Sequence, residues 1–125
     1  RVGPYRRAIK KDEIGHSMGQ LTTGLSQIEQ QFHIRAITPE FEILMRLYEN
    51  GPMASAALRS TSRASSAAFS LILKRLVGGE LLQVEHDRAD RRVRKYDLTP
   101  AARAVLGEFA ETAVRVLSTD TRPKD

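Results

Sequence analysis

Apolar residues recur at alternating intervals of four and three near the start of the chain, which is the spacing of one helical stripe. The members are Ile14, Met18, Leu21, Leu25, Ile28 and Phe32. They predict a helix over about residues 12–33, although three glycines within it lower its intrinsic helix propensity. A stripe this long in a short chain favours packing against a second subunit, and an intramolecular bundle helix is the alternative.

A second helix is expected to begin at Thr38-Pro39-Glu40, which supplies a hydroxyl N-cap, a proline at the first helical position and an acid in the first turn. Asn50-Gly51-Pro52 ends it. Its apolar face comprises Phe41, Leu44, Met45 and Tyr48. A short third helix is expected over residues 54–60, with Ala57 and Leu58 facing inward.

Residues 61–63 form a predicted turn, and a fourth helix is expected over residues 64–77 before Gly78-Gly79. Its buried face comprises Phe69, Ile72, Leu73 and Leu76. Strands at about 81–86 and 92–98 then flank a charged tip and predict a β-hairpin, which is marginally stable unless it packs on something else.

Thr99-Pro100 repeats the cap-and-proline signal and opens a last helix over residues 100–118. Its stripe comprises Ala102, Leu106, Phe109, Ala113 and Val116. We expect dimerisation helices at 12–36 and 100–118, with contacts made by Ile14, Met18, Leu21, Leu25, Leu106, Phe109, Ala113 and Val116.

The order of helix, short helix, turn, helix and hairpin is that of a winged helix-turn-helix. The predicted fold class is therefore α+β, mainly α with a small β-hairpin wing, in one domain spanning residues 1–125. The winged helix-turn-helix would occupy residues 38–98, between the two dimerisation helices.

Charge is unevenly distributed along the 125 residues, whose formal net charge is +5. Residues 1–11 carry five basic and no acidic groups, and residues 51–97 carry nine basic and five acidic groups. Residues 12–50, by contrast, carry two basic and six acidic groups. A positive middle beside a negative flank indicates an anionic partner for one face, although a solvated surface is the alternative.

Catalytic and metal chemistry find little support in the sequence. There are no cysteines, and the three histidines (His16, His33 and His86) are scattered, without metal-ligand spacing. No nucleophile elbow or phosphate-binding glycine loop is present. We therefore expect no enzyme activity, metal or cofactor. No apolar run approaches the length of a membrane span, so we expect a cytoplasmic protein without membrane association.

A recognition helix at 64–77 would present its polar and small residues to the major groove of double-stranded DNA. The candidates are Ser65, Ser66, Ala67, Ser70 and Lys74. Hydroxyls can bond to phosphates or base edges, and alanine methyls can contact thymine methyls. Arginines of the wing at Arg88, Arg91 and Arg94 would reach the backbone and the minor groove.

Residues 38–106 resemble the winged-helix domain of the MarR family of transcription regulators. The resemblance rests on Thr38-Pro39-Glu40-Phe41, on Gly51-Pro52, and on Asp90-Arg91-Arg92 leading through Tyr96 to Leu98-Thr99. It implies a homodimer with one winged helix on each half-site, and a small aromatic or anionic effector bound between the dimerisation layer and the DNA-binding lobe. It also implies that Asp90 braces the wing by pairing with Arg92.

Several features depart from the family pattern, among them a short last helix and, at Ala67 and Ala68, small apolar residues where polar ones are usual. Leu71 stands where an arginine is usual, and Glu80 stands where a glycine is expected just before Leu81. Our prediction is a dimeric, sequence-specific transcription repressor, released by a small molecule, in which the wing supplies more affinity than the mild recognition helix. The alternative is a winged helix that binds a protein through the apolar face at Ala67, Ala68 and Leu71.

Overall fold

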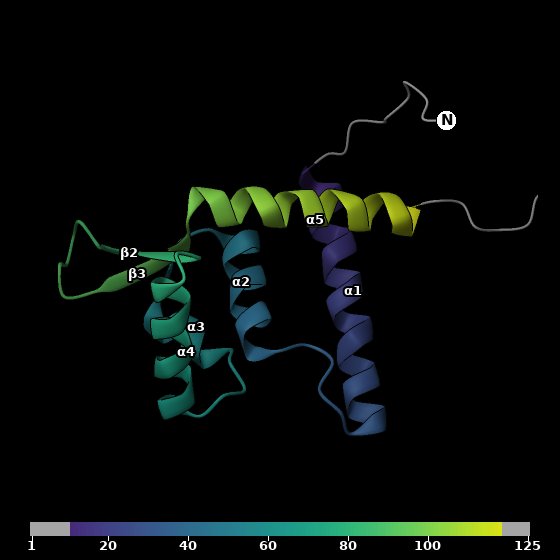
Figure 1. The fold of residues 1–125 in the computed structure, drawn as a ribbon, viewed down its shortest axis with the longest axis horizontal. Coiled ribbons are helices and arrows are strands. Elements are labelled where there is room, and N and C mark those ends of the chain that lie inside the picture. Colours follow the sequence, from purple (N-terminus) through teal and green to yellow (C-terminus); the bar gives the residue numbers. More distant parts are fainter. Residues whose placement is uncertain (1–10, 119–125) are drawn as a thin grey trace, which may run out of the picture.

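The computed structural model describes the backbone of residues 11–118 and the side chains of residues 19–116. The elements are α1 (Lys11–Phe32), α2 (Pro39–Asn50), β1 (Met53–Ala54), α3 (Ser55–Ser60), α4 (Ser66–Gly78), β2 (Leu82–His86), β3 (Arg94–Leu98) and α5 (Pro100–Ser118). In Figure 1, α5 spans the molecule and meets α1, while the β2–β3 hairpin extends beyond α4. The mainly α fold with a small antiparallel sheet is confirmed. Residues 1–10, which carry most of the basic groups noted at the start of the chain, lie outside the described part.

Helix α2 begins and ends where its capping residues predict. The Phe41 N–H donates to Thr38 Oγ1 at 3.1 Å, and Pro39 occupies the first helical position. At the other end, the N–H of Gly51 donates to the Leu47 carbonyl oxygen at 2.8 Å. Gly51 has φ 78°, a left-handed value that glycine adopts without steric strain.

Helix α4 begins at Ser66, two residues later than the predicted start at residue 64. Ser65 has extended backbone angles, and its Oγ accepts a hydrogen bond from the Ala68 N–H at 3.2 Å, so that it caps the helix. Ala64 belongs instead to the preceding turn, where its N–H donates to Ser62 Oγ at 3.1 Å. Ser62 and Ser65 both have hydroxyl groups that can cap the start of a helix, and the sequence pattern did not show which of them precedes α4.

The sheet has three antiparallel strands in the order β1-β3-β2, and its shortest strand was missed by the sequence analysis. Strand β1 pairs with β3, with Met53 opposite Tyr96. With only two residues, β1 is too short to show a periodic pattern in the sequence. The hairpin itself pairs from Leu82 opposite Leu98 to His86 opposite Arg94. Its second strand therefore begins at residue 94 rather than 92, because residues 92 and 93 belong to the tip.

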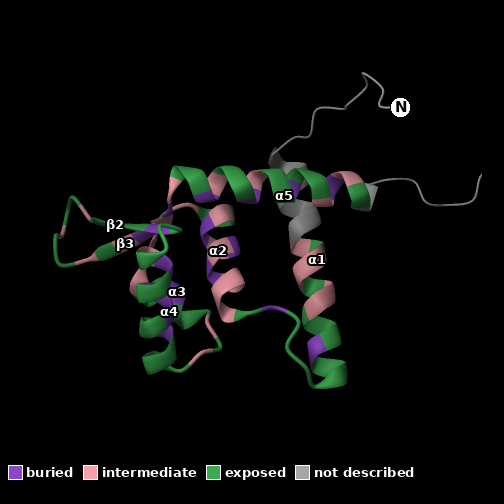
Figure 2. Cartoon of the chain, viewed as in Figure 1, coloured by how far each residue is buried: buried purple, intermediate pink, exposed green. Residues whose placement is uncertain are grey.

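The core lies where α2, α4, α5 and the sheet meet, shown in purple in Figure 2. Helix α2 contributes Ile43, Met45 and Leu47 to it, whereas the sequence stripe had omitted Ile43 and Leu47. A helix that is packed between several elements buries more than one stripe. In α3, Leu58 is buried as expected, but the prediction that Ala57 faces inward was wrong, because its side chain is exposed.

Helix α5 buries a face that coincides only in part with its predicted stripe, which was expected to contact a second subunit. Its buried residues recur every four positions, at Ala102, Leu106, Ala110 and Val114. Phe109 is 40% exposed and Val116 is 64% exposed, so the predicted stripe is split between the core and the surface.

Arg103 fixes the start of α5 to the sheet and to α2. Its Nη2 donates to Asp97 Oδ1 at 2.9 Å and to the Leu47 carbonyl oxygen at 3.3 Å. Its guanidinium also lies 5.8 Å from the centre of the Tyr48 ring. The hairpin is thereby held on the helical core, which supplies the support that an isolated hairpin lacks.

Candidate nucleic-acid interface

The outward face of α4 carries the residues that the sequence analysis proposed for base recognition. Ser66, Ala67, Ser70 and Lys74 are all exposed, on the side of the helix opposite Phe69 and its buried neighbours. Ser65 is the N-cap residue, so its hydroxyl oxygen is engaged by the helix.

Arg59 of α3 reaches the first turn of α4, a contact that the sequence did not reveal. Its Nη1 donates to Ser66 Oγ at 2.8 Å. This contact holds a guanidinium beside the N-terminus of α4, where the unpaired N–H groups of the first turn already favour anions. Basic and hydroxyl groups are thus gathered at one end of the helix, in a position suited to a phosphate group.

An open groove with a volume of about 750 Å³ runs between α3, α4 and the hairpin. It is lined by Ser55, Ala56, Arg59, Ala67, Phe69, Ser70, Leu71, Leu73, Lys74, Val77, Val84, Arg94 and Tyr96. Three of these side chains are basic and none is acidic. A concave surface with this charge favours a polyanion.

The wing tip, residues 87–93, is ordered by its own hydrogen bonds. The Asp87 N–H donates to the Val93 carbonyl oxygen, and the Val93 N–H donates to the Asp90 carbonyl oxygen, both at 3.0 Å. The Arg92 guanidinium forms a bidentate ion pair with the Asp90 carboxylate, in which Nε donates to Oδ1 at 3.0 Å and Nη2 donates to Oδ2 at 3.1 Å. The Arg92 backbone N–H also donates to Oδ1, at 3.1 Å.

These contacts favour the charged form of Asp90. The hydrogen bonds from the Arg92 side chain, and then from its backbone N–H, hold the pKa of the Asp90 carboxyl below its ordinary value. The pairing that the family resemblance implied is therefore present. Among the described residues, no ion pair or hydrogen bond engages the side chains of Arg88, Arg91 or Arg94, all of which are exposed.

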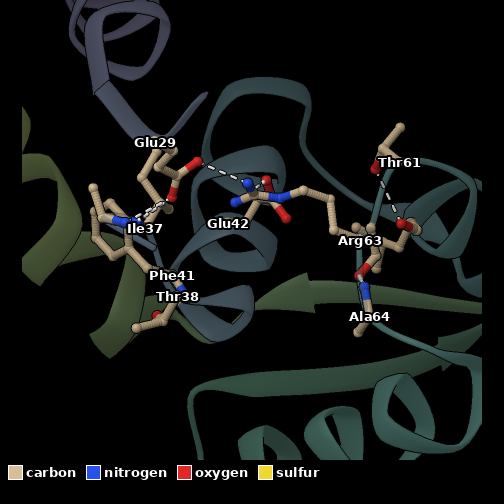
Figure 3. A network of polar contacts seen from close by, with 11 residues as sticks. Glu29, Ile37, Thr38, Phe41, Glu42, Thr61, Arg63 and Ala64 are labelled. Atoms are coloured by element: carbon tan, nitrogen blue, oxygen red, sulfur yellow. Dashed lines mark hydrogen bonds and ion pairs between the residues drawn. The ribbon is translucent and has the colours of Figure 1, made fainter. Parts of the chain in front are cut away.

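A buried carboxylate behind the interface links α1 to the turn that precedes α4 (Figure 3). Glu29 Oε2 accepts hydrogen bonds from the N–H groups of Ala36 and Ile37, at 2.7 and 2.9 Å. Its Oε1 accepts one from Arg63 Nη1 at 2.7 Å. The other guanidinium nitrogen of Arg63 lies 3.4 Å from Glu42 Oε2, which brings α2 into the same network.

This arrangement stabilises the ionised Glu29. The Arg63 hydrogen bond, and then the backbone N–H of Ile37, lower the pKa of its carboxyl from 4.5 to about 2. Sequence reasoning missed Glu29, although its place four residues after Leu25 puts an acid on the apolar stripe of α1. That signal indicates a buried partner but does not identify Arg63, which is 34 residues away.

The residues proposed for dimerisation fall into three groups. Ile14 and Met18 lie where side chains are not described. Leu21, Leu25 and Ala113 are half-buried, and Leu106 is buried within this chain. Phe109 and Val116 are exposed, as are three apolar side chains of α1 and α5 that were not proposed for dimerisation, Ile28, Phe32 and Val105.

A smaller cavity of about 260 Å³ lies between α1 and α2. It is lined by Thr22, Thr23, Ser26, Ile37, Phe41, Glu42, Met45, Arg46 and Glu49. Glu42 Oε1 and Arg46 Nε are buried there without a hydrogen-bond partner among the described residues. The cavity therefore combines an apolar wall with polar groups of both charges.

The described residues contain no cluster of three or more potential metal-ligating side chains among histidine, aspartate and glutamate. Within that same part of the chain, every helix is too short or too polar to span a bilayer.

Comparison with known proteins identifies related folds. The MarR family model matches residues 38–93. The apo form of a Lactococcus lactis ZitR mutant is 30% identical, with a TM-score of 0.55 over 81% of this chain and 75% of that one. Bordetella bronchiseptica BpsR, whose DNA binding is regulated by 6-hydroxynicotinic acid, is 27% identical, with a TM-score of 0.53 over 97% of this chain and 88% of that one.

Reduced AbfR bound to DNA is 20% identical, with a TM-score of 0.51 over 82% of this chain and 74% of that one, and shares the fold. No curated protein sequence matches the chain.

Proposed function

The chain belongs to the MarR family of DNA-binding transcription regulators, and we propose that it acts as a homodimeric repressor that binds promoter DNA through α4 and the wing. A protein that covers a promoter obstructs the polymerase, so we expect repression. The observation that carries the proposal is the groove between α4 and the hairpin, whose charged side chains are all basic. Arg88 and Arg91 at the wing tip add two exposed basic side chains.

In this arrangement α4 enters the major groove and the wing lies over the neighbouring backbone and minor groove. Arg88 and Arg91 are suited to that position because neither side chain is engaged by a protein carboxylate among the described residues. Asp90 and Arg92 act as a brace that presents them. Arg94 and Lys74 line the protein groove between α4 and the hairpin and are suited to phosphate contacts.

We further propose that a small aromatic or anionic effector binds in the cavity between α1 and α2 and releases the DNA. Phe41 and Met45 offer an apolar wall for an aromatic ring, and Arg46 offers a cation beside the carboxylates of Glu42 and Glu49.

Binding to promoter duplexes tests the proposal directly. Fluorescence anisotropy with DNA from the region upstream of the protein's own gene should give an affinity that falls steeply with salt, because phosphate contacts release counterions. Arg91→Ala should weaken binding to every duplex and reduce the salt slope by about one. Ser66→Ala should instead change the preference among duplexes.

Arg35→Ala is the matched control, since it removes the same charge from an exposed position between α1 and α2, outside α4 and the wing. Its affinity for DNA should stay near that of the parent. Equal losses for Arg91→Ala and Arg35→Ala would contradict the assignment of the wing.

The second candidate function is binding to a protein partner. Leu71, exposed on α4 beside Ala67 and Ala68, is the observation that favours it. Recovery of a stable protein partner through this face, together with salt-insensitive or absent DNA binding, would favour that function over the first.

A further inference from the structure

We propose that Leu71 and Ala67 read the 5-methyl groups of thymine, so that the recognition helix selects DNA by apolar contact rather than by bidentate hydrogen bonds. This inference rests on the proposed function, in which α4 enters the major groove. It assigns Leu71 as a specificity-determining residue and names the chemical feature of the DNA that it recognises.

Leu71 has no structural role in the core of this chain. Its side chain is 57% exposed, whereas Ile72 and Leu73 beside it are buried. It occupies the middle of the outward face, one helical turn after Ala67 and about one turn before Lys74. An apolar side chain at the centre of this face gains free energy only when something covers it.

The polar alternatives on α4 are few. Its first two turns, residues 66–73, contain no arginine, lysine, asparagine or glutamine. Those are the side chains that form bidentate hydrogen bonds with guanine or adenine. The remaining hydroxyls, at Ser66 and Ser70, bond to bases or phosphates without distinguishing strongly among them. The thymine methyl is the major-groove feature that the alanine and leucine side chains can recognise.

Small residues on the same face allow close approach. Ala67 and Ala68 lack atoms beyond Cβ, so that the backbone of α4 can lie near the base edges and bring Leu71 against them. Basic groups stand on either side of this apolar centre, with Arg59 at the start of α4 and Lys74 one turn beyond Leu71.

The charge of the groove favours DNA over a protein partner for this surface. Arg59, Lys74 and Arg94 border the same concavity as Leu71, and no carboxylate lies among its lining residues. A polyanion with apolar methyl groups satisfies both features at once, because its phosphates meet the basic rim while its thymines meet the leucine.

The test begins with duplexes that the full chain selects from a random-sequence pool. Selected duplexes should share thymines at fixed positions. Replacing those thymines by deoxyuridine removes the methyl group and leaves base pairing intact, and should weaken binding about four-fold for each methyl in contact. Deoxyuridine at other positions serves as the matched control and should have no effect.

Two variants connect the effect to Leu71. Leu71→Ser should bind thymine and deoxyuridine duplexes equally at the position that this residue contacts. Leu71→Met should retain a preference for thymine because it keeps an apolar side chain of similar volume. Unchanged thermal unfolding is expected for both, since the side chain is largely exposed.

The outcomes separate this inference from the proposed function. Salt-sensitive DNA binding by a parent that does not distinguish thymine from deoxyuridine would overturn the methyl readout and leave the proposed function standing. Absence of salt-sensitive binding to any duplex would overturn both. Equal thymine preference in the parent and in Leu71→Ser would show that Leu71 is not the residue responsible.

Discussion

At the scale of single residues, two glutamates occupy positions that are unusual for glutamate. Glu80 has a left-handed backbone conformation, and Glu29 is buried. Glu80 has φ 62°, in the left-handed region that favours glycine. It follows α4 in a hydrogen-bonded turn, in which the N–H of Glu80 donates to the Val77 carbonyl oxygen and the N–H of Leu81 donates to that of Leu76. These two bonds define a Schellman motif, in which the left-handed residue is usually glycine.

Glu80→Gly should therefore stabilise the protein. Relief of the left-handed strain is expected to raise the free energy of unfolding by about 1 kcal/mol. Thermal or denaturant unfolding at one fixed protein concentration measures the change. Glu80→Ala is the control, because it removes the carboxylate but keeps the Cβ atom that causes the strain. Stabilisation of the same size in both variants would indicate that the charge, not the backbone, is responsible.

Glu29 is the second such residue, and its environment predicts a pH dependence. Its pKa is about 2 in the folded protein, against an ordinary value of 4.5. Because the folded-state value is the lower one, the stabilisation is fully present above pH 4.5 and is lost as the pH falls towards 2.

Glu29→Gln should destabilise the protein at neutral pH, since the neutral amide cannot replace the carboxylate for Arg63 and two backbone N–H groups. The difference in free energy of unfolding between parent and variant should narrow as the pH falls from 4.5 towards 2. Denaturant titrations across that range provide the measurement, with exposed Glu49→Gln as the control. A difference that stays constant with pH would contradict the assigned environment.

At the scale of elements, the wing is a short hairpin whose tip is organised by one ion pair. Arg92 is largely exposed, with 91% of its side chain accessible, so the Asp90–Arg92 pair contributes little to global stability. Its physical effect is local, because three hydrogen bonds to one carboxylate restrict the tip that carries Arg88 and Arg91.

Asp90→Ala should weaken DNA binding several-fold while leaving the melting temperature nearly unchanged. The sign of the change in affinity separates the two explanations, because loss of an acidic group would by charge alone strengthen binding to a polyanion. Glu85→Gln is the control, since it removes an equal charge from β2 without touching the tip, and its affinity should equal or exceed that of the parent. Tighter binding by Asp90→Ala would show that the brace is not needed.

At the scale of the whole molecule, one chain leaves apolar residues uncovered on the two helices that flank the DNA-binding lobe. Phe32, which is 66% exposed, and Val116 lie on α1 and α5, and both follow the spacing expected of a helix interface. Such surface is the physical basis for expecting a homodimer.

Val116→Glu places a charge on that surface and should shift the protein from dimer to monomer. Sedimentation velocity measures the oligomeric state, and anisotropy should show a parallel loss of DNA affinity, because a monomer engages only one half-site. Glu108→Gln on the same helix should remain dimeric. An unaltered sedimentation coefficient for Val116→Glu would remove this residue from the proposed interface.

Local signals explain which parts of this protein were predictable from the sequence. Helix boundaries at Thr38 and Thr99 follow from capping chemistry, and the hairpin follows from a charged tip between two short strands, because these interactions are made between residues close together in the chain. The resemblance to MarR regulators was likewise carried by short motifs at the start of α2, before α3 and in the wing. The family was therefore identified from the sequence, and the roles of its site residues remain predictions.

Tertiary packing decided the rest. Strand β1 exists because Met53 lies beside Tyr96, and the acid at Glu29 became a structural centre because Arg63 folds back onto it. The buried face of α5 was fixed by the elements it crosses rather than by its own periodicity. Each of these features depends on contacts between residues distant in the sequence, for which a local pattern carries no partner information, whereas caps and turns contain both partners within a few residues.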